Sequence, residues 1–179
     1  VGEHRAVECE ADAQVHLAVG MPANERMDWL VEKATELGVH RITPLMTERS
    51  VIRLTGERAE KKQAHWQAVA ASASEQCGRN RVPLIDAPER LDAWLAKQTA
   101  KADVVQCVLS LHASTQPLTA MRANAVQKSW VLLNGPEGGL TDAEDAAARA
   151  KGFVALSLGD RVLRAETAAL GALALLTLA

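Results

Sequence analysis

The feature that most constrains the fold is a series of short apolar runs separated by segments with helical periodicity. Residues 104–111, 130–134 and 153–158 are almost continuously apolar, as expected of strands covered on both faces. Earlier in the chain, apolar residues occupy positions 27, 30, 31, 34 and 37, the spacing of one helix face. Strands that alternate with helices predict an α/β fold: a parallel sheet with helices on both faces.

The remaining segments complete this alternation. Further strands are predicted over residues 15–19, 42–46 and 82–85, and further helices over 57–77, 91–97, 142–150 and 166–178. Pro44 predicts that residues 42–46 form an edge strand or end there, because proline cannot donate to a strand ladder. Thr141 and Glu144 have the spacing of a capping box, which starts the helix after position 141.

Composition excludes several classes of protein. The chain has 179 residues, 48% hydrophobic and 23% charged, which excludes disordered and fibrous proteins. Its net charge of −2 gives no global attraction for nucleic acid, so any polyanion site must be local. One Phe, four Trp and no Tyr argue against a protein that stacks single-stranded bases on aromatic side chains. The tryptophans lie on apolar stripes and are expected in the core.

Membrane, disulfide and metal-bound classes are not favoured either. The longest apolar run, residues 168–179, is shorter than the roughly 20 residues of a membrane-spanning helix. The three cysteines form no C-x-x-C pair, and the five histidines lack metal-ligand spacing. We therefore expect a cytoplasmic protein with no metal and no membrane partner.

Two glycine-bearing loops follow predicted strands and lead into predicted helices. The first is Gly-Pro-Glu-Gly-Gly at 135–139, and the second is Leu-Gly-Asp-Arg-Val-Leu-Arg at 158–164. Glycine lets a backbone approach a ligand closely, and ligands of open α/β sheets bind beyond the carboxyl ends of the strands. The loops are therefore candidates for two walls of one pocket. Either could instead be a turn that only joins strand to helix. Neither a dinucleotide nor a P-loop motif is present.

Basic residues gather in two other places. In Ser-Glu-Gln-Cys-Gly-Arg-Asn-Arg (74–81), Arg79 and Arg81 could contact phosphates, or could simply occupy a solvated helix end. A scattered basic stretch, expected to be solvated surface, comprises Arg41, Arg49, Arg53 and Arg58.

Four segments together resemble a known family. They are EKATELGV (32–39), SEQCGRNRVP (74–83), LNGPEGGLT (133–141) and LGDRVLRAETA (158–168). Their order and spacing resemble the bacterial RsmE family from about residue 15 to the C-terminus. This family uses S-adenosylmethionine to methylate N3 of a uridine in 16S rRNA of the small ribosomal subunit.

The resemblance implies further properties. The family belongs to the SPOUT methyltransferases, whose parallel sheet ends in a C-terminal trefoil knot that binds the cofactor. It also implies a homodimer with each active site near the subunit interface. Members begin with a small barrel similar to a PUA domain. We therefore expect residues 1–20 to be a remnant of that mostly absent barrel, and residues 21–179 to form the SPOUT methyltransferase domain.

The expected site combines the glycine loops with this resemblance. Residues expected to contact the cofactor are Leu111, Asn134, Gly135, Pro136, Glu137, Gly138, Gly139, Leu158, Gly159, Arg161, Val162, Leu163 and Arg164. Uracil N3 must lose a proton, which requires a base or stabilisation of the developing anion. We expect Arg164 to stabilise an anion or phosphate, Glu166 to act as base or base-orienter, and Arg79 to contact phosphate.

Some positions depart from the family pattern, and other functions remain open. Asn134 stands where an apolar residue is usual, and Asp160 where proline is common. The alternatives are a non-catalytic knotted RNA-binding or ribosome-assembly factor, a SPOUT methyltransferase that acts on another RNA, and an α/β enzyme for a different adenine-containing ligand.

Overall fold

The fold is that of a computed structural model, which describes residues 8–23, 26–111, 114–126 and 128–178. The strands are β1 (Gln14–Gly20), β2 (Arg41–Met46), β3 (Leu84–Ile85), β4 (Glu89–Arg90), β5 (Val104–Leu109), β6 (Gln116–Pro117), β7 (Ser129–Asn134) and β8 (Val154–Ser157). The helices are α1 (Arg26–Glu36), α2 (Gly56–Cys77), α3 (Leu91–Ala96), α4 (Leu118–Asn124), α5 (Asp142–Ala150) and α6 (Ala165–Thr177).

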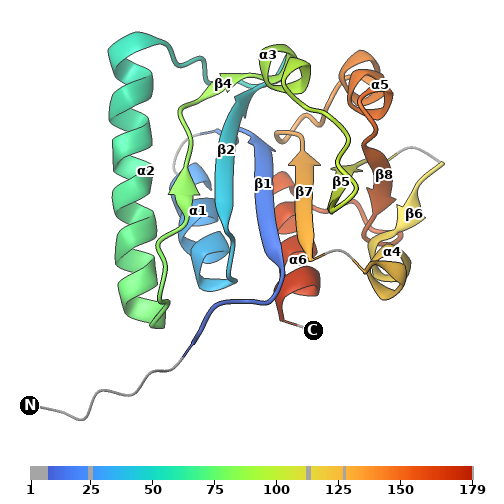
Figure 1. Ribbon diagram of the computed structural model, residues 1–179. Coiled ribbons are helices and arrows are strands. Elements are labelled where there is room, and N and C mark those ends of the chain that lie inside the picture. Colours follow the sequence, from blue (N-terminus) through green and yellow to red (C-terminus); the bar gives the residue numbers. More distant parts are fainter. Residues whose placement is uncertain (1–7, 24–25, 112–113, 127, 179) are drawn as a thin grey trace, which may run out of the picture.

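One sheet organises the molecule, and each of its strand pairs is parallel. The strand order is β3-β2-β1-β7-β5-β8-β6, with β4 also paired to β2 (Figure 1). β1 lies between β2 and β7, with Leu17 opposite Ile42 on one side and Leu132 on the other. The predicted α/β fold with a parallel sheet is confirmed.

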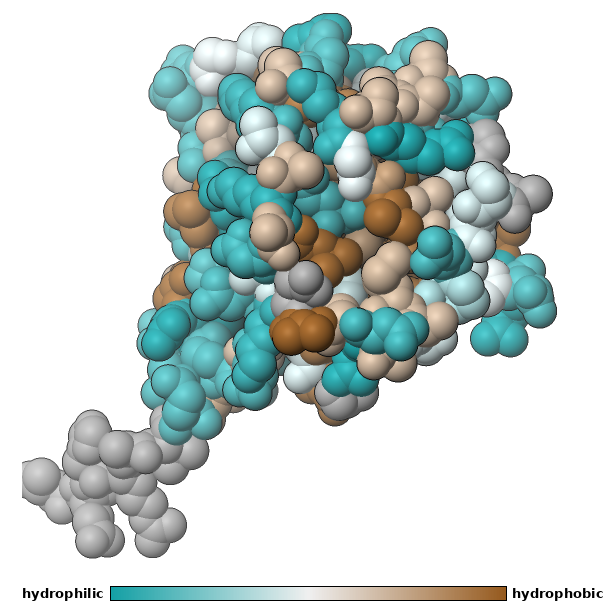
Figure 2. Space-filling model, turned by 45° about the vertical axis from the view of Figure 1, so that its right-hand side comes forward, coloured by the Kyte–Doolittle hydropathy of each residue, from teal (hydrophilic) through white to brown (hydrophobic). Residues whose placement is uncertain are grey.

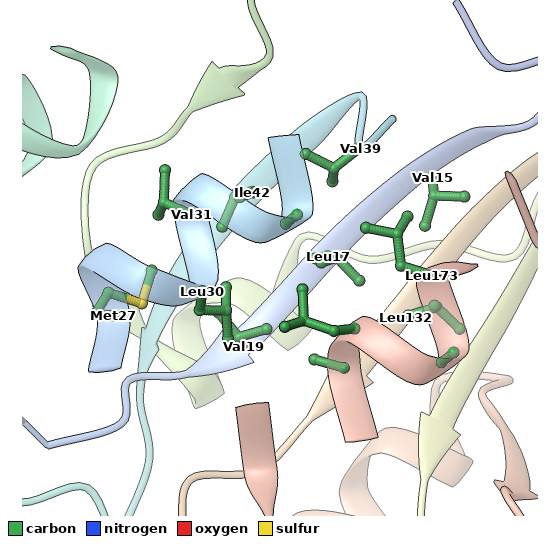
Figure 3. Close-up of a cluster of buried hydrophobic side chains, with 14 of the residues drawn as sticks. Val15, Leu17, Val19, Met27, Leu30, Val31, Val39, Ile42, Leu132 and Leu173 are labelled. Carbon is green, nitrogen blue, oxygen red and sulfur yellow. The ribbon is translucent and has the colours of Figure 1, made fainter. Parts of the chain in front are cut away.

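Each face of the sheet carries its own apolar core. On one face, β1 and β7 pack against α1, α2 and α6, where Leu17, Leu30 and Leu173 are fully buried or nearly so (Figure 3). On the other face, α3 and α5 cover the sheet with Trp94 and Ala148. Successive β7 residues alternate between the two cores because strand side chains point to opposite faces. Helices therefore cover both faces, as predicted.

The α/β domain includes residues that we expected to belong to a barrel remnant. Residues 14–20 form β1, and their backbone pairs with β2 and β7 in the middle of the sheet. The expected boundary at residue 21 is therefore wrong, since removal of β1 would divide the sheet. Residues 1–7 of the expected remnant lie outside the described part of the chain.

The structure corrects three other expectations. β2 is not an edge strand: its residues 41–42 pair with β3 and 45–46 with β4, so Pro44 falls between the two paired segments. The strands β4 and β6, of two residues each, and the helix α4, of seven residues, were not predicted. Trp29 is 46% exposed, whereas the other three tryptophans are buried as expected.

Candidate functional site

A cavity of about 390 Å³ lies where β5, β7 and β8 end at the carboxyl edge of the sheet. Its walls come from residues 109–111 after β5, 134–140 after β7, and 156–159 and 161–163 after β8. Parallel strands place these three chain segments at one edge, although they are far apart in the sequence. The two glycine-bearing loops therefore do line a single cavity.

The first of these loops, residues 134–140, is a tight turn that only glycine permits at its base. A Cβ at Gly135 would lie 2.6 Å from the backbone nitrogen of Leu140 and 2.7 Å from the carbonyl carbon of Gly139. The Gly139 amide donates to the Pro136 carbonyl at 2.8 Å, and Gly139 has a φ of +70°. The loop therefore folds back on itself and presents backbone to the cavity.

Side chains from distant parts of the chain hold this loop. Arg49 donates from Nη1 to the Gly138 carbonyl at 2.7 Å, and its aliphatic stem lies over Gly138. On the other side, Glu137 accepts from the Ala23 backbone amide at 2.9 Å. Beyond the loop, Thr141 and Glu144 form the predicted capping box of α5. The loop is thus tied to both neighbouring segments and to its own helix.

The second loop, residues 158–164, joins β8 to α6. Gly159 has a φ of +103°, which explains the need for glycine there. At the start of α6, the Asn134 side-chain amide donates to the Ala165 carbonyl at 2.9 Å. This buried amide is the departure noted in the sequence, and it fixes the end of β7 to the beginning of α6.

Twelve of the thirteen residues expected at a cofactor line the cavity; Arg164 does not. Further lining residues that the sequence reasoning did not select are Arg49, Leu109, Ser110, Leu140, Asp142, Asp145, Leu156, Ser157, Ala165 and Ala168. Most of these are chain neighbours of the selected loops. Arg49 is different: we assigned it to solvated surface, and only the sheet topology brings it to the first loop.

The residues expected in catalysis are not gathered in one place. Arg164 is exposed at the residue before α6, next to the lining residues Leu163 and Ala165. Glu166 is only 7% exposed, its Oε1 lies 4.0 Å from Nη1 of Arg26, and its Oε2 has no hydrogen-bond partner among the described residues. A carboxylate this buried is not placed to take a proton from a substrate base.

Arg79 lies at the opposite edge of the sheet, with its side chain 6% exposed. Its guanidinium forms an ion pair with Glu10 and donates to the carbonyls of Thr35 at 3.1 Å and Val39 at 2.8 Å. Thr35 lies in the last turn of α1, and Val39 lies between α1 and β2. The expectation that Arg79 contacts phosphate is therefore wrong for this arrangement, because its donors are already used to join α1, α2 and β2.

Comparison with known proteins identifies the family. The RNA methyltransferase domain family matches residues 9–177. The chain belongs to this family. Ribosomal RNA small subunit methyltransferase E of Bacillus subtilis is 34% identical over 92% of this chain, and that of Synechocystis is likewise 34% identical over 92%. The chain spans 65% and 53% of the length of these two relatives.

Solved structures share the fold of this RNA methyltransferase domain. The enzyme from Neisseria gonorrhoeae bound to S-adenosyl methionine is 35% identical with a TM-score of 0.84, over 95% of this chain and 68% of that one. A putative methyltransferase from Legionella pneumophila in complex with the same cofactor is 38% identical with a TM-score of 0.85, at the same coverage. The SpoU methyltransferase AviRb from Streptomyces viridochromogenes shares only the fold, at 16% identity and a TM-score of 0.53.

Three further facts describe this methyltransferase domain. Within the described ranges, no group of three or more His, Cys, Asp or Glu side chains is arranged to hold a metal ion. Nor does any helix there combine the length and apolar character needed to cross a membrane. Burial raises the pKa of the Cys107 thiol to about 12, so this cysteine is not an available nucleophile.

Proposed function

We propose that this domain binds S-adenosylmethionine in the cavity at the carboxyl edge and methylates N3 of a uridine in 16S rRNA of the small ribosomal subunit. The observation that carries the proposal is the meeting of the two glycine-bearing loops around one cavity. Relatives of the same fold, at 35% and 38% identity, hold this cofactor.

The cavity fits such a ligand in size and chemistry. Its volume of about 390 Å³ falls in the range of roughly 300–1,000 Å³ that is typical of sites for drug-sized ligands. Gly135 and Gly139 supply close backbone approach for the polar groups of a nucleoside, and Leu109, Leu156 and Leu158 supply apolar surface for its base. We therefore propose the twelve lining residues named above as the cofactor site.

When bound, S-adenosylmethionine supplies a methyl group already activated on a sulfonium. The chain's own residues would then hold the substrate uracil in line and disperse the negative charge that N3 carries once it has released its proton to water. We assign the charge-stabilising role to Arg164, an exposed cation beside the cavity. Glu166 is too buried to act directly, so its proposed role is to orient the start of α6.

The C-terminal trefoil knot is also part of the proposal. β8 pairs with both β5 and β6, although α4, β7 and α5 separate it from β6 in the sequence. α6 follows β8 and returns to pack on β1 and α1, near the middle of the sheet (Figure 1). This order of segments is what a chain threaded through its own loop would produce.

We further propose a cytoplasmic homodimer. Large apolar side chains remain exposed beside the cavity, with Leu111 at 80% and Val162 at 77% exposure. Figure 2 shows apolar side chains gathered among hydrophilic ones in the middle of one face of the molecule. A second copy would cover such surface. Light scattering at micromolar concentration should give twice the mass of one chain, and a single-chain mass would contradict the dimer.

Two measurements test the cofactor and the reaction separately. Calorimetry should detect one S-adenosylhomocysteine bound per chain. Incubation with methyl-labelled S-adenosylmethionine and small ribosomal subunits should then place the label on N3 of a uridine in 16S rRNA. Absence of binding would contradict the cofactor site. Binding without label transfer would favour a non-catalytic assembly factor, and label at another atom or in another RNA would contradict the substrate.

A further inference from the structure

Arg26, the first residue of α1, lies between carboxylates from both walls of the cavity. Its Nη1 donates to Glu137 Oε1 at 3.2 Å and lies 4.0 Å from Glu166 Oε1. Glu137 belongs to the loop 134–140, whereas Glu166 belongs to the first turn of α6, which follows the loop 158–164. One guanidinium nitrogen therefore faces both walls, although Arg26 itself does not line the cavity.

The two carboxylates depend on Arg26 to different degrees. Glu137 also accepts the Ala23 amide, so it has a second partner in the segment before α1. Glu166 is 7% exposed with an unpartnered Oε2, and Arg26 is the one cation within 4.0 Å of it in the described part of the chain. An unpaired buried carboxylate is strongly unfavourable, so this ion pair helps to hold the start of α6, together with the Asn134 amide that donates to Ala165.

We propose that Arg26 is a positioning residue that couples the two cofactor loops, by bridging Glu137 on one wall and Glu166 on the other. The inference rests on the proposed function of the cavity. Arg26 acts through the carboxylates rather than on a ligand. Its loss allows the wall at residues 134–140 and the wall before α6 to separate, which enlarges a site whose affinity depends on close backbone approach from both sides.

The coupling is tested with S-adenosylhomocysteine affinity, measured by calorimetry on the full chain. Arg26→Ala is expected to weaken binding roughly tenfold, as for loss of a charge-assisted hydrogen bond. Glu137→Gln is expected to weaken it less, because the amide oxygen still accepts from Ala23. In the double variant the two effects should be less than additive, since both remove the same bridge. Arg26→Lys restores the charge and should recover part of the affinity.

Controls separate this role from simpler ones. Arg58→Ala removes an equal charge from an exposed position in α2 that does not line the cavity, and it should leave affinity unchanged. Thermal unfolding of each variant identifies a general loss of fold. In transfer assays, Arg26→Ala should raise KM for the cofactor more than it lowers kcat.

Three outcomes would overturn the inference. The first is wild-type affinity in Arg26→Ala, and the second is fully additive effects in the double variant. The third is unchanged cofactor affinity with weakened ribosomal RNA binding, which would make Arg26 a direct RNA contact. If the wild-type chain itself binds no S-adenosylhomocysteine, the proposed function fails instead, and the two failures are therefore distinguishable.

Discussion

At the scale of single residues, the glycines of the first loop are not equivalent. The sequence predicts that the Gly-Pro-Glu-Gly-Gly loop needs glycine, but it cannot say at which position backbone crowding is greatest. The structure gives that answer: a Cβ at Gly135 meets backbone at 2.6 Å, whereas a Cβ at Gly138 meets Cβ and Cδ of the Arg49 side chain at 3.2 and 3.3 Å. A side chain can move, but the backbone of a closed turn cannot move without opening it.

We therefore predict different outcomes for two matched substitutions. Gly135→Ala should open the loop, reduce the free energy of unfolding by about 2 kcal/mol and weaken S-adenosylhomocysteine binding at least tenfold. Gly138→Ala should have a smaller effect on both quantities, because Arg49 has to give way by only a few tenths of an ångström. Urea unfolding and calorimetry check the pair. Equal behaviour of the two variants would show that the turn at Gly135 is more adaptable than its contacts imply.

A second residue-scale feature is a histidine that is held neutral. His16 Nε2 lies 2.6 Å from Thr43 Oγ1, which donates to Asp86, and Asp86 in turn pairs with Arg41. Burial, reinforced by the positive charge of Arg41, lowers the pKa of His16 to about 4. The unfolded chain has the ordinary value of about 6.5, so between pH 6.5 and pH 4 it binds more protons than the folded chain.

Stability should therefore fall as the pH is lowered through this window. The His16 contribution between pH 7 and pH 5 is about 1–2 kcal/mol of unfolding free energy. His16→Gln keeps a polar group near Thr43 but does not titrate, so its stability should depend less on pH over the same interval. Urea denaturation of both proteins at pH 5, 6 and 7 measures the difference. Parallel pH dependences would exclude His16 as its source.

At the scale of elements, the long helices and strands of the fold could be predicted, whereas several of the short ones could not. The strands β5, β7 and β8 follow from continuous apolar runs, and α5 follows from its capping box. The strands β4 and β6 have two residues each, so the sequence shows no periodicity for them. They form through backbone pairing with β2 and β8 respectively. Arg79 was misread for a related reason: sequence shows a cation at a helix end, but not which carbonyls surround it.

The Arg79 correction gives an element-scale prediction. Arg79→Ala should destabilise the domain by roughly 3 kcal/mol, because it removes the cation paired with the part-buried Glu10 and a donor to each of two carbonyls. S-adenosylhomocysteine affinity should not change, since the cavity lies at the other edge of the sheet. Arg81→Ala, at a side chain 66% exposed, is the control and should alter stability by less than about 0.5 kcal/mol. A loss of affinity in Arg79→Ala with normal stability would restore a binding role.

At the scale of the whole molecule, the two apolar cores share one sheet, and this arrangement should make unfolding cooperative. The pattern of the sequence predicts both covered faces, but the strand order that brings the three loops to one cavity comes from contacts far apart in the chain, such as Gln14 opposite Ser129. Local patterns carry no information on such pairings. Because β1 and β7 contribute to both cores, a substitution that disrupts packing in one core should also destabilise the other core through these shared strands.

We predict that core substitutions on opposite faces shift the same single transition. Leu173→Ala removes packing from the α1 and α6 face, and Leu91→Ala removes packing from the α3 face. Each substitution should reduce the free energy of unfolding by about 3 kcal/mol. With fluorinated tryptophan, fluorine NMR follows Trp66 on one face and Trp94 on the other during urea titration. The two signals should lose their folded intensity at the same urea concentration in every variant, since neither core retains a sheet once the other is lost. Separate midpoints for Trp66 and Trp94 would mean that one layer of helices can leave while the remaining sheet stays folded.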